Sequence, residues 1–293
     1  MLERRQVAHY ASSGGVREDI AERDIILTYV LRIMSESVLP KLAFKGGTCL
    51  KKVYFGNIGR FSMDLDFTGL NTRPEELKEE INDLLNDKSW YDIDFTIEDE
   101  NLTPESYLAE VRYAHAWNQG PIFKLQVSFR EQPVFAPAEL PLHSEVYFKY
   151  CEFQSLHVQC MKRDEVLSEK IRAAFQRVSS RDLYDLYLFA GLPYDRDTIK
   201  KLVVLKCWNV RDPFDPELFL DQVERGAYDW DDLRSLVRRE RLPSEREMVA
   251  EVVDEYQYLE NMDDELSKII GDSRAHREND LVNKVLADLR DEK

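Results

Sequence analysis

The chain has 293 residues, of which 43% are hydrophobic and 33% are charged, and its formal net charge is −16. This length and hydrophobic fraction predict a folded protein with a large core. The negative charge argues against general, sequence-independent binding of nucleic acid, because such binding needs a broad basic surface. No window approaches the roughly 18 uncharged apolar residues that a membrane span needs, and the N-terminus has no apolar signal core, so we expect a cytoplasmic protein.

The cysteines and histidines give no sign of a metal site. The cysteines form no CxxC pair and no regular framework, which favours reduced structural thiols and argues against zinc; they are Cys49, Cys151, Cys160 and Cys207. The histidines lie far apart without the spacing of metal ligands, so we interpret them as ordinary surface or core residues.

The N-terminal part of the chain predicts a helix, a strand and a glycine turn in succession. Apolar residues recur at helical spacing over Arg17–Ser37. Leu42–Lys45 then reads as a short strand that enters the turn Gly46-Gly47-Thr48, and a helix is predicted after it. Such a turn points backbone N–H groups and a helix N-terminus at one place, which favours an anion. Glycine pairs are also common in purely structural turns.

The segment Ser62–Thr68 predicts a strand with an acidic face. Alternation places Asp64 and Asp66 on the same face as Ser62 and Thr68, and places the apolar residues on the opposite face. Two neighbouring carboxylates repel each other unless a cation lies between them, and Mg²⁺ prefers oxygen ligands while leaving room for phosphate. The sequence therefore predicts a metal-dependent phosphate site.

Strands dominate the middle of the chain, and helices follow. The segments after the acidic strand predict a helix over Pro74–Leu85, then strands at Tyr91–Ile97, Tyr107–Tyr113, Ile122–Phe129 and Val146–Val158, with a long proline-rich loop before the last. Helices are predicted at Glu165–Arg177 with Asp164 as N-cap, then at Arg181–Ala190, Thr198–Val210, Pro216–Glu224, Trp230–Arg239, Glu245–Ile270 and Glu278–Leu289. This order predicts an α+β fold, a mixed sheet flanked by helices with an all-helical C-terminal portion. We divide it into a catalytic domain over 1–190 and a helical domain over 191–293.

A second group of polar residues lies on the first two helices of this helical portion. Lys170, Ala174 and Arg177 share one stripe that can reach phosphates, while Arg181 and Asp185 are four residues apart and can pair. A surface helix pair with weak ion pairs is the alternative. Basic residues also gather beside the glycine turn and the acidic strand, namely Lys41, Lys45, Lys51, Lys52 and Arg60.

Four blocks in this order resemble the nucleotidyltransferase superfamily, and more narrowly the AbiEii-type and MenT-type toxins of type IV toxin–antitoxin systems. The blocks are FKGGTCLKK, RFSMDLDF, EKIRAAFQR and RDLYDLY, and the resemblance covers roughly Asp19 to Ala190. It implies a nucleotidyltransferase fold and a Mg²⁺-dependent enzyme, with Mn²⁺ as a substitute.

The resemblance also implies roles for individual residues. The turn residues Gly46, Gly47 and Thr48 match the part that holds a nucleoside triphosphate, and Asp64 and Asp66 match the metal-binding pair. Lys170 matches a lysine that acts on the phosphates, and Asp185 matches an acidic residue that activity requires. We also expect Arg60, Ser62, Arg177 and Arg181 near the phosphates.

Many members of the superfamily carry a third carboxylate on a later strand, where this chain has Gln126. An amide cannot deprotonate an attacking hydroxyl. Either another residue, such as Asp185, is the base, or the enzyme is slow. Asp94 and Glu110 are further candidates for the missing carboxylate, although both also fit solvent-facing strand positions.

The leading functional hypothesis is a toxin that transfers a nucleotide from a triphosphate to an acceptor, with the tRNA 3′ end implied by the resemblance, and thereby blocks translation and growth. The same machinery also suits transfer to a protein or to the enzyme itself. A nucleotide-binding module with little turnover is the non-enzymatic alternative. A cognate antitoxin is an expected partner.

Overall fold

The computed structural model describes residues 2–150 and 156–291, and the chain divides into two compact units. The sheet unit spans Met1–Pro133, Pro137–Met161 and Ser235–Arg241. The helical unit spans Val134–Ala136, Lys162–Arg234 and Leu242–Lys293. The predicted boundary at residue 190 divides the chain by function and stays a prediction.

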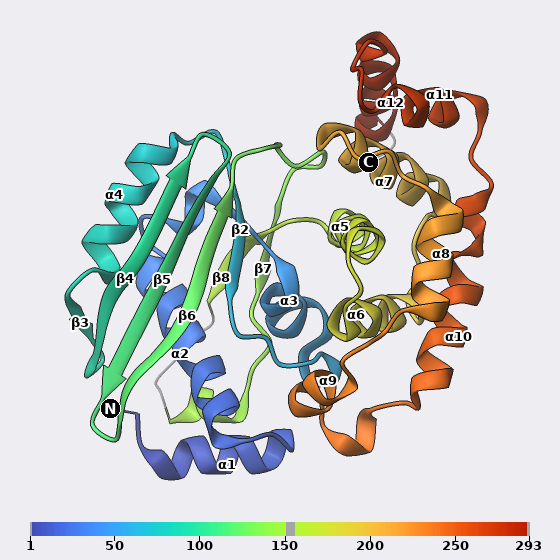
Figure 1. Ribbon diagram of the computed structural model, residues 1–293. Helices are drawn as coiled ribbons and strands as arrows, with labels where there is room; N and C mark the ends of the chain where they lie inside the picture. Colours follow the sequence, from blue (N-terminus) through green and yellow to red (C-terminus); the bar gives the residue numbers. More distant parts are fainter. Residues whose placement is uncertain (1, 151–155, 292–293) are drawn as a thin grey trace. The chain divides into compact units, whose positions relative to one another are not determined.

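A mixed sheet forms the centre of the sheet unit (Figure 1). Its eight strands lie in the order β3-β4-β5-β6-β2-β1-β8-β7. The strands are β1 (Leu42–Lys45), β2 (Leu65–Gly69), β3 (Lys88–Trp90), β4 (Ile93–Thr103), β5 (Ser106–His115), β6 (Asn118–Ser128), β7 (Ala138–Pro141) and β8 (His157–Cys160). Strand β2 runs antiparallel to β1 and parallel to β6, so the strands that flank the glycine turn lie in the middle of the sheet.

Alternation explains why these segments are strands. In β6 the side chains of Phe123, Leu125 and Val127 are buried, whereas Lys124 and Gln126 between them are exposed. One face of the strand therefore joins the core and the other faces solvent.

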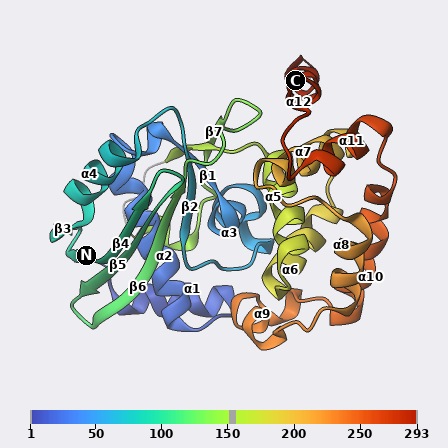
Figure 2. The same cartoon turned by 45° about the horizontal axis from the view of Figure 1, so that its top comes forward.

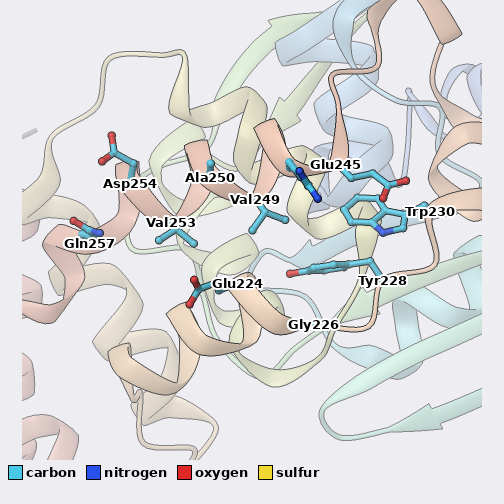
Figure 3. A pocket seen from close by; sticks show the side chains of 11 residues that line it. Glu224, Gly226, Tyr228, Trp230, Glu245, Val249, Ala250, Val253, Asp254 and Gln257 are labelled. Atoms are coloured by element: carbon cyan, nitrogen blue, oxygen red, sulfur yellow. The ribbon is translucent and has the colours of Figure 1, made fainter.

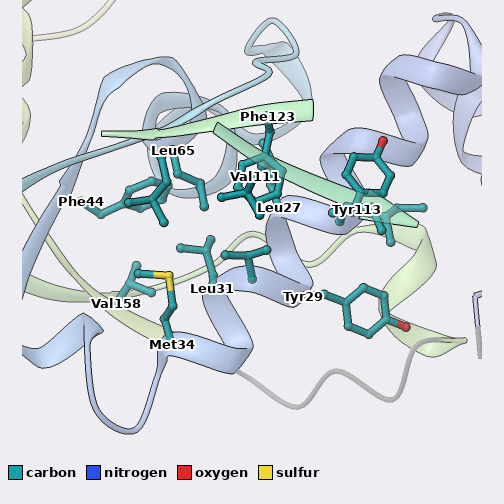
Figure 4. Close-up of a cluster of buried hydrophobic side chains, with 14 of the residues drawn as sticks. Leu27, Tyr29, Leu31, Met34, Phe44, Leu65, Val111, Tyr113, Phe123 and Val158 are labelled. Atoms are coloured by element: carbon teal, nitrogen blue, oxygen red, sulfur yellow. The ribbon is translucent and has the colours of Figure 1, made fainter. Parts of the chain in front are cut away.

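The α-helices wholly within the described part of the sheet unit are α1 (Arg4–Gly14), α2 (Glu18–Met34), α3 (Gly46–Cys49) and α4 (Pro74–Leu85). In α4, Leu77, Ile81 and Leu85 recur every four residues and are buried. Helix α2 is buried over most of its surface, and its Leu27 and Leu31 pack with Phe44 and Leu65 in the core shown in Figure 4. The helix predicted over Arg17–Ser37 is therefore confirmed as Glu18–Met34, with most of its surface buried.

Helices make up the helical unit, and they are drawn from yellow to red in Figure 2. They are α5 (Arg163–Gln176), α6 (Ser180–Ala190), α7 (Arg196–Asn209), α8 (Pro216–Arg225), α9 (Trp230–Leu236), α10 (Glu245–Tyr256), α11 (Asp264–Asp272) and α12 (Asn279–Asp291). A separate apolar core joins α7, α11 and α12 through residues such as Leu202, Ile269 and Val285. The predicted α+β fold class, with a mixed sheet and a helical C-terminal region, is confirmed.

Several predicted elements differ from the structure. Helix α1 and strands β3 and β7 were not predicted. The helix predicted over Glu245–Ile270 is two α-helices, because Asp263 caps a new helix by accepting a hydrogen bond from the backbone N–H of Leu266. Helix α5 begins at Arg163 rather than after Asp164.

The strand predicted over Val146–Val158 is also wrong in part. Val146–Lys149 forms a 3₁₀ turn, and β8 begins only at His157. Residues 151–155, including Cys151, lie outside the described residues. Within the described part of the chain, no helix is long and apolar enough to cross a membrane.

Candidate functional site

The glycine turn follows β1 directly and lies against the carboxylate of Asp66. Lys45, the last residue of β1, pairs in register with Asp66 of β2. Gly46 adopts φ +73°, a left-handed conformation, and a Cβ at this position would lie 2.8 Å from the Cβ of Asp66. Both the backbone conformation and the close approach therefore require glycine here.

Gly47 and Thr48 bring the segment before β2 against the same turn. A Cβ at Gly47 would lie 2.6 Å from a guanidinium nitrogen of Arg60 and 2.9 Å from the hydroxyl oxygen of Ser62. The hydroxyl of Thr48 donates a hydrogen bond to the carbonyl oxygen of Asp64. The predicted turn residues and the predicted residues Arg60, Ser62, Asp64 and Asp66 thus lie together.

The two aspartates stand at the beginning of β2. Asp64 precedes the strand, and its Oδ1 accepts a hydrogen bond of 3.1 Å from the backbone N–H of Lys124 on β6. Asp66 lies in the strand, and both residues are half-buried. The predicted strand over Ser62–Thr68 therefore begins later, at Leu65, because the side chain of Asp64 takes a backbone donor of the neighbouring strand.

The faces of β2 differ in part from the prediction. Leu65 and Phe67 are buried as expected, and the ring of Phe67 lies 5.2 Å from that of Phe44. Thr68 is also buried, although we placed it on the polar face of the strand.

The donors at this edge of the sheet suit a hard cation that brings other ligands with it. In 2–150 and 156–291, no group of three or more His, Cys, Asp or Glu side chains is placed to hold a metal ion. Asp64 and Asp66 supply carboxylate oxygens, so a cation here would complete its ligands with water or substrate oxygens. Mg²⁺ commonly binds in this way, through one or two carboxylates and phosphate oxygens.

The structure places the candidates for a third carboxylate clearly. Gln126 is the parallel register partner of Asp66, so the amide occupies the neighbouring position on β6. Glu110 on β5 instead forms an ion pair of 3.3 Å with Lys124, and Asp94 on β4 is exposed.

The second predicted group lies in the helical unit and is built of buried charges. The ammonium of Lys170 on α5 lies 3.0 Å from Asp182 and 2.8 Å from Asp185, both on α6. Arg177 follows α5 and contacts Asp182 at 2.8 Å. The two aspartates are each 1% exposed, so their charges depend on these cations for stabilisation.

Arg181 belongs to a different ion pair from the one we predicted. Its guanidinium makes two hydrogen bonds to Asp232, of 2.5 and 2.6 Å. The ion pair that Arg181 makes is thus with Asp232, while Asp185 contacts the ammonium of Lys170.

Asp182 is a member of this cluster that the sequence analysis did not assign to the site. It lies in the first turn of α6, where a carboxylate favours the helix end, and it bridges Lys170 and Arg177. The signal was present in the sequence, because Asp182 and Asp185 are three residues apart and therefore lie on one face of the helix.

The basic residues beside the glycine turn are partly committed to carboxylates. The ammonium of Lys51 lies 2.7 Å from Glu145, and that of Lys52 lies 2.9 Å from Asp24. Burial lowers the pKa of Lys52, and the neighbouring Asp24 opposes that shift. Lys51 and Lys52 thus serve the packing of the short π-helix Leu50–Phe55.

A strand, a glycine turn and a helix are followed by a paired strand with one aspartate in it and one just before it, as the resemblance to a nucleotidyltransferase predicts. The sequence profile described as "Nucleotidyl transferase AbiEii toxin, Type IV TA system" matches residues 31–273. The chain therefore belongs to the AbiEii family of nucleotidyltransferase toxins, as the four sequence blocks predicted.

A solved structure agrees with this assignment. MenT4, a nucleotidyltransferase toxin from Mycobacterium tuberculosis H37Rv, is similar with a TM-score of 0.84 and 25% sequence identity. The similarity covers 99% of this chain and 100% of that one. No curated protein sequence matches the chain significantly.

Proposed function

We propose that this protein is a Mg²⁺-dependent nucleotidyltransferase that moves a nucleoside monophosphate from a triphosphate to the 3′ end of tRNA, and so blocks translation and growth. The observation that carries the proposal is the packing of the Gly46 turn against the carboxylate of Asp66. That packing brings a helix-initiating backbone suited to phosphate within reach of carboxylates suited to a divalent cation.

In the sheet unit, the backbone of Gly46 and Gly47 would receive the triphosphate, assisted by Thr48. Arg60 is only 5% exposed and lies against Gly47, which supports a role in fixing the turn and neutralising phosphate charge. Ser62 can add a hydroxyl at the same place.

Asp64 and Asp66 would hold the Mg²⁺ or Mn²⁺. When bound, such an ion withdraws charge from the phosphate oxygens and favours the departure of pyrophosphate. The hydrogen bond from Lys124 fixes one oxygen of Asp64 and leaves its second oxygen for the ion.

In the helical unit, we assign Lys170 and Arg177 to the phosphates. Asp182 and Asp185 hold the ammonium of Lys170 between them. Two carboxylates around one ammonium fix its position, so the charge needs little reorganisation when the reaction occurs.

The reaction itself is a displacement at the α-phosphorus. The oxygen of the acceptor hydroxyl forms a bond to that phosphorus, the bond to the β-phosphate oxygen breaks, and pyrophosphate leaves. The proton of the hydroxyl passes to a base or to water. Because the carboxylate of Asp185 is engaged by Lys170, we assign it to positioning and leave proton removal to solvent, which fits a slow enzyme with Gln126 beside Asp66.

The proposal also names an acceptor, tRNA, and a protein partner, the cognate antitoxin. Membership of a type IV toxin family supports a growth-arresting transferase and a cognate antitoxin. The tRNA acceptor rests on the resemblance of the four sequence blocks.

The test is a transfer assay on the full chain. The protein is incubated with Mg²⁺, each α-labelled nucleoside triphosphate in turn, and either total tRNA or total protein. Asp66→Ala is the test variant, and Asp94→Ala is the matched control, because Asp94 is an exposed carboxylate on β4 of the same sheet.

Label on tRNA that is lost in Asp66→Ala and kept in Asp94→Ala supports the proposal. Label on protein, or on the enzyme itself, replaces the tRNA acceptor while keeping the site. Tight binding of triphosphate without label on any acceptor would indicate a nucleotide-binding module instead.

A further inference from the structure

A small cavity in the sheet unit lies outside both predicted groups of site residues. It has a volume of about 230 Å³ and is lined by the end of α1 and by parts of the segments 57–61, 144–146 and 237–241. All of these segments belong to the sheet unit. We call it the α1 cavity. Pockets for drug-sized ligands begin at about 300 Å³, so the α1 cavity suits a smaller group.

Two oppositely charged side chains that line the α1 cavity are buried. The ammonium of Lys51 and the carboxylate of Glu145 lie 2.7 Å apart, and their side chains are 3% and 9% exposed. Lys51 also donates a hydrogen bond of 3.1 Å to the carbonyl oxygen of Gly56. An ammonium has three N–H donors, so one donor remains beyond these two acceptors among the described residues.

Two arginines add positive charge that the lining does not balance. The Nε of Arg238 lies 3.1 Å from Glu240, whose carboxylate is 77% exposed and does not line the α1 cavity. Arg241 donates a hydrogen bond to the carbonyl oxygen of Asn57. Each guanidinium has five N–H donors, so most of them stay available beside these described contacts. The described lining thus carries three cationic side chains and one carboxylate.

This excess of positive charge contrasts with the rest of the chain, whose formal net charge is −16. A larger cavity in the helical unit, of about 560 Å³, has the opposite sign. Three carboxylates and one arginine line it (Figure 3), namely Glu224, Glu245, Asp254 and Arg246. A cavity with surplus cations and many N–H donors concentrates anions and repels metal ions.

The end of α1 does not oppose an anion in this place. Ser13 and Gly14 line the α1 cavity, and the C-terminal end of a helix carries partial negative charge on its free carbonyl groups. Here the carbonyl oxygens of Ala11 and Ser12 accept hydrogen bonds from the backbone N–H groups that follow the helix, at 3.1 and 3.3 Å. The hydroxyl of Ser13 bonds to the carbonyl oxygen of Tyr10 at 3.2 Å.

We propose that the α1 cavity binds a phosphate monoester. The guanidinium groups of Arg238 and Arg241 would hold the phosphate oxygens, and the remaining N–H of Lys51 would add a further contact. The carbon part of the ligand would pack on Phe61 and Val237, which line the cavity and are 5% and 3% exposed. This binding requires neither a divalent cation nor nucleotidyl transfer, so each proposal can fail separately.

Saturation-transfer NMR on the full chain tests the proposal with ribose 5-phosphate as the probe. Ribose is the matched compound without the phosphate. EDTA is present, so that no divalent cation brings phosphate to Asp64 and Asp66. A 5′-phosphorylated dinucleotide and its 5′-hydroxyl form are then used as competitors, because a phosphate monoester occurs both in small metabolites and at the 5′ end of a nucleic acid.

The protein variant is Arg238→Gln with Arg241→Gln, which removes two guanidinium groups from the lining. The matched control is Arg239→Gln with Arg246→Gln, which removes two exposed guanidinium groups that do not line the α1 cavity. Since each partly exposed charge contact contributes about a two- to fivefold change in affinity, we expect binding about five- to twentyfold weaker in the first variant and unchanged in the second.

Binding of ribose 5-phosphate but not of ribose, weakened only in the variant of Arg238 and Arg241, supports the proposal. Within that result, displacement of the probe by the phosphorylated dinucleotide below the probe's own concentration assigns the ligand to a nucleic-acid end, and weaker displacement assigns it to small phosphate esters. Absence of binding, equal binding of ribose, equal weakening by both variants, or full binding by the first variant would overturn the proposal.

Discussion

The two groups of predicted site residues use charge in opposite ways. In the sheet unit, Asp64 and Asp66 are half-buried and lie against glycine backbone and hydroxyl groups. In the helical unit, Asp182 and Asp185 are 1% exposed and surround the ammonium of Lys170. The first pair of carboxylates is half-buried beside the glycine turn, whereas the second pair belongs to a buried cluster of charges.

This difference predicts that the two groups respond differently to substitution. Water still reaches a half-buried carboxylate, so we expect its removal to cost the fold little while it costs the chemistry much. Removing one member of a buried ion cluster leaves its partner's charge in a poorly solvated place, which costs stability directly.

The largest expected effect is that of Asp66→Ala on activity. We expect label transfer to fall by about 10²- to 10³-fold, because a preorganised electrostatic contact at the reacting phosphate is lost. The free energy of unfolding should change by less than about 1 kcal/mol, as is usual away from a packed core. Transfer rates and urea unfolding of the same preparation measure both quantities. An inactive variant that is also several kcal/mol less stable would mean that Asp66 is structural.

Asp185→Ala should instead lower stability first. Breaking a buried ion pair costs about 3–5 kcal/mol, and we expect about 2–3 kcal/mol here because Asp182 still faces Lys170. Urea unfolding measures the loss. Adding Lys170→Met to Asp185→Ala should lower stability further, because the buried carboxylate of Asp182 then loses the ammonium that it contacts at 3.0 Å. A fully stable Asp185→Ala variant would contradict the contrast between the two groups.

Gly46→Ala tests the turn separately from the carboxylates. A side chain at φ +73° costs about 1–2 kcal/mol, and the added Cβ would also displace Asp66. Gly15→Ala carries a similar backbone cost at φ +65°, with only the flexible side chain of Arg238 in the way. We expect a greater loss of stability in Gly46→Ala than in Gly15→Ala, and at least a tenfold greater loss of transfer. Equal transfer rates would remove the turn from the site.

Arg181→Ala is expected to have the smallest effect. The guanidinium and the carboxylate of Asp232 are 37% and 30% exposed, so their pair contributes less than about 1 kcal/mol. Because Arg181 is engaged by Asp232, we expect label transfer within about fivefold of the parent. A loss of label transfer as large as that of Asp66→Ala would indicate that Arg181 binds the phosphates, as the sequence analysis predicted.

What the sequence predicted well was local. Strand β1, helix α4 and the glycine turn depend on patterns within a few residues, and their predicted bounds agree with the structure. The grouping of the turn with Asp64 and Asp66 also follows from a short segment whose two strands pair with each other.

Contacts between residues far apart in the chain could not be predicted from the sequence. Asp64 meets the backbone of Lys124, 60 residues away, and this contact sets where β2 begins. Arg181 meets Asp232, 51 residues away, and Lys51 meets Glu145, 94 residues away. No helical or strand period encodes such contacts. The sequence analysis therefore paired Arg181 with Asp185 on the same helix, and it counted Lys51 among the basic residues beside the glycine turn.

Binding of Mn²⁺ followed by electron paramagnetic resonance tests the central claim, that Asp64 and Asp66 form the metal and triphosphate site. The signal of free Mn²⁺ is recorded in the presence of a non-hydrolysable triphosphate. Three proteins are compared: the parent chain, the Asp66→Asn variant and the Asp94→Asn variant. The account predicts that the parent and Asp94→Asn remove free Mn²⁺ beyond what the nucleotide alone binds, and that Asp66→Asn does not. Equal uptake of Mn²⁺ by all three proteins would contradict it.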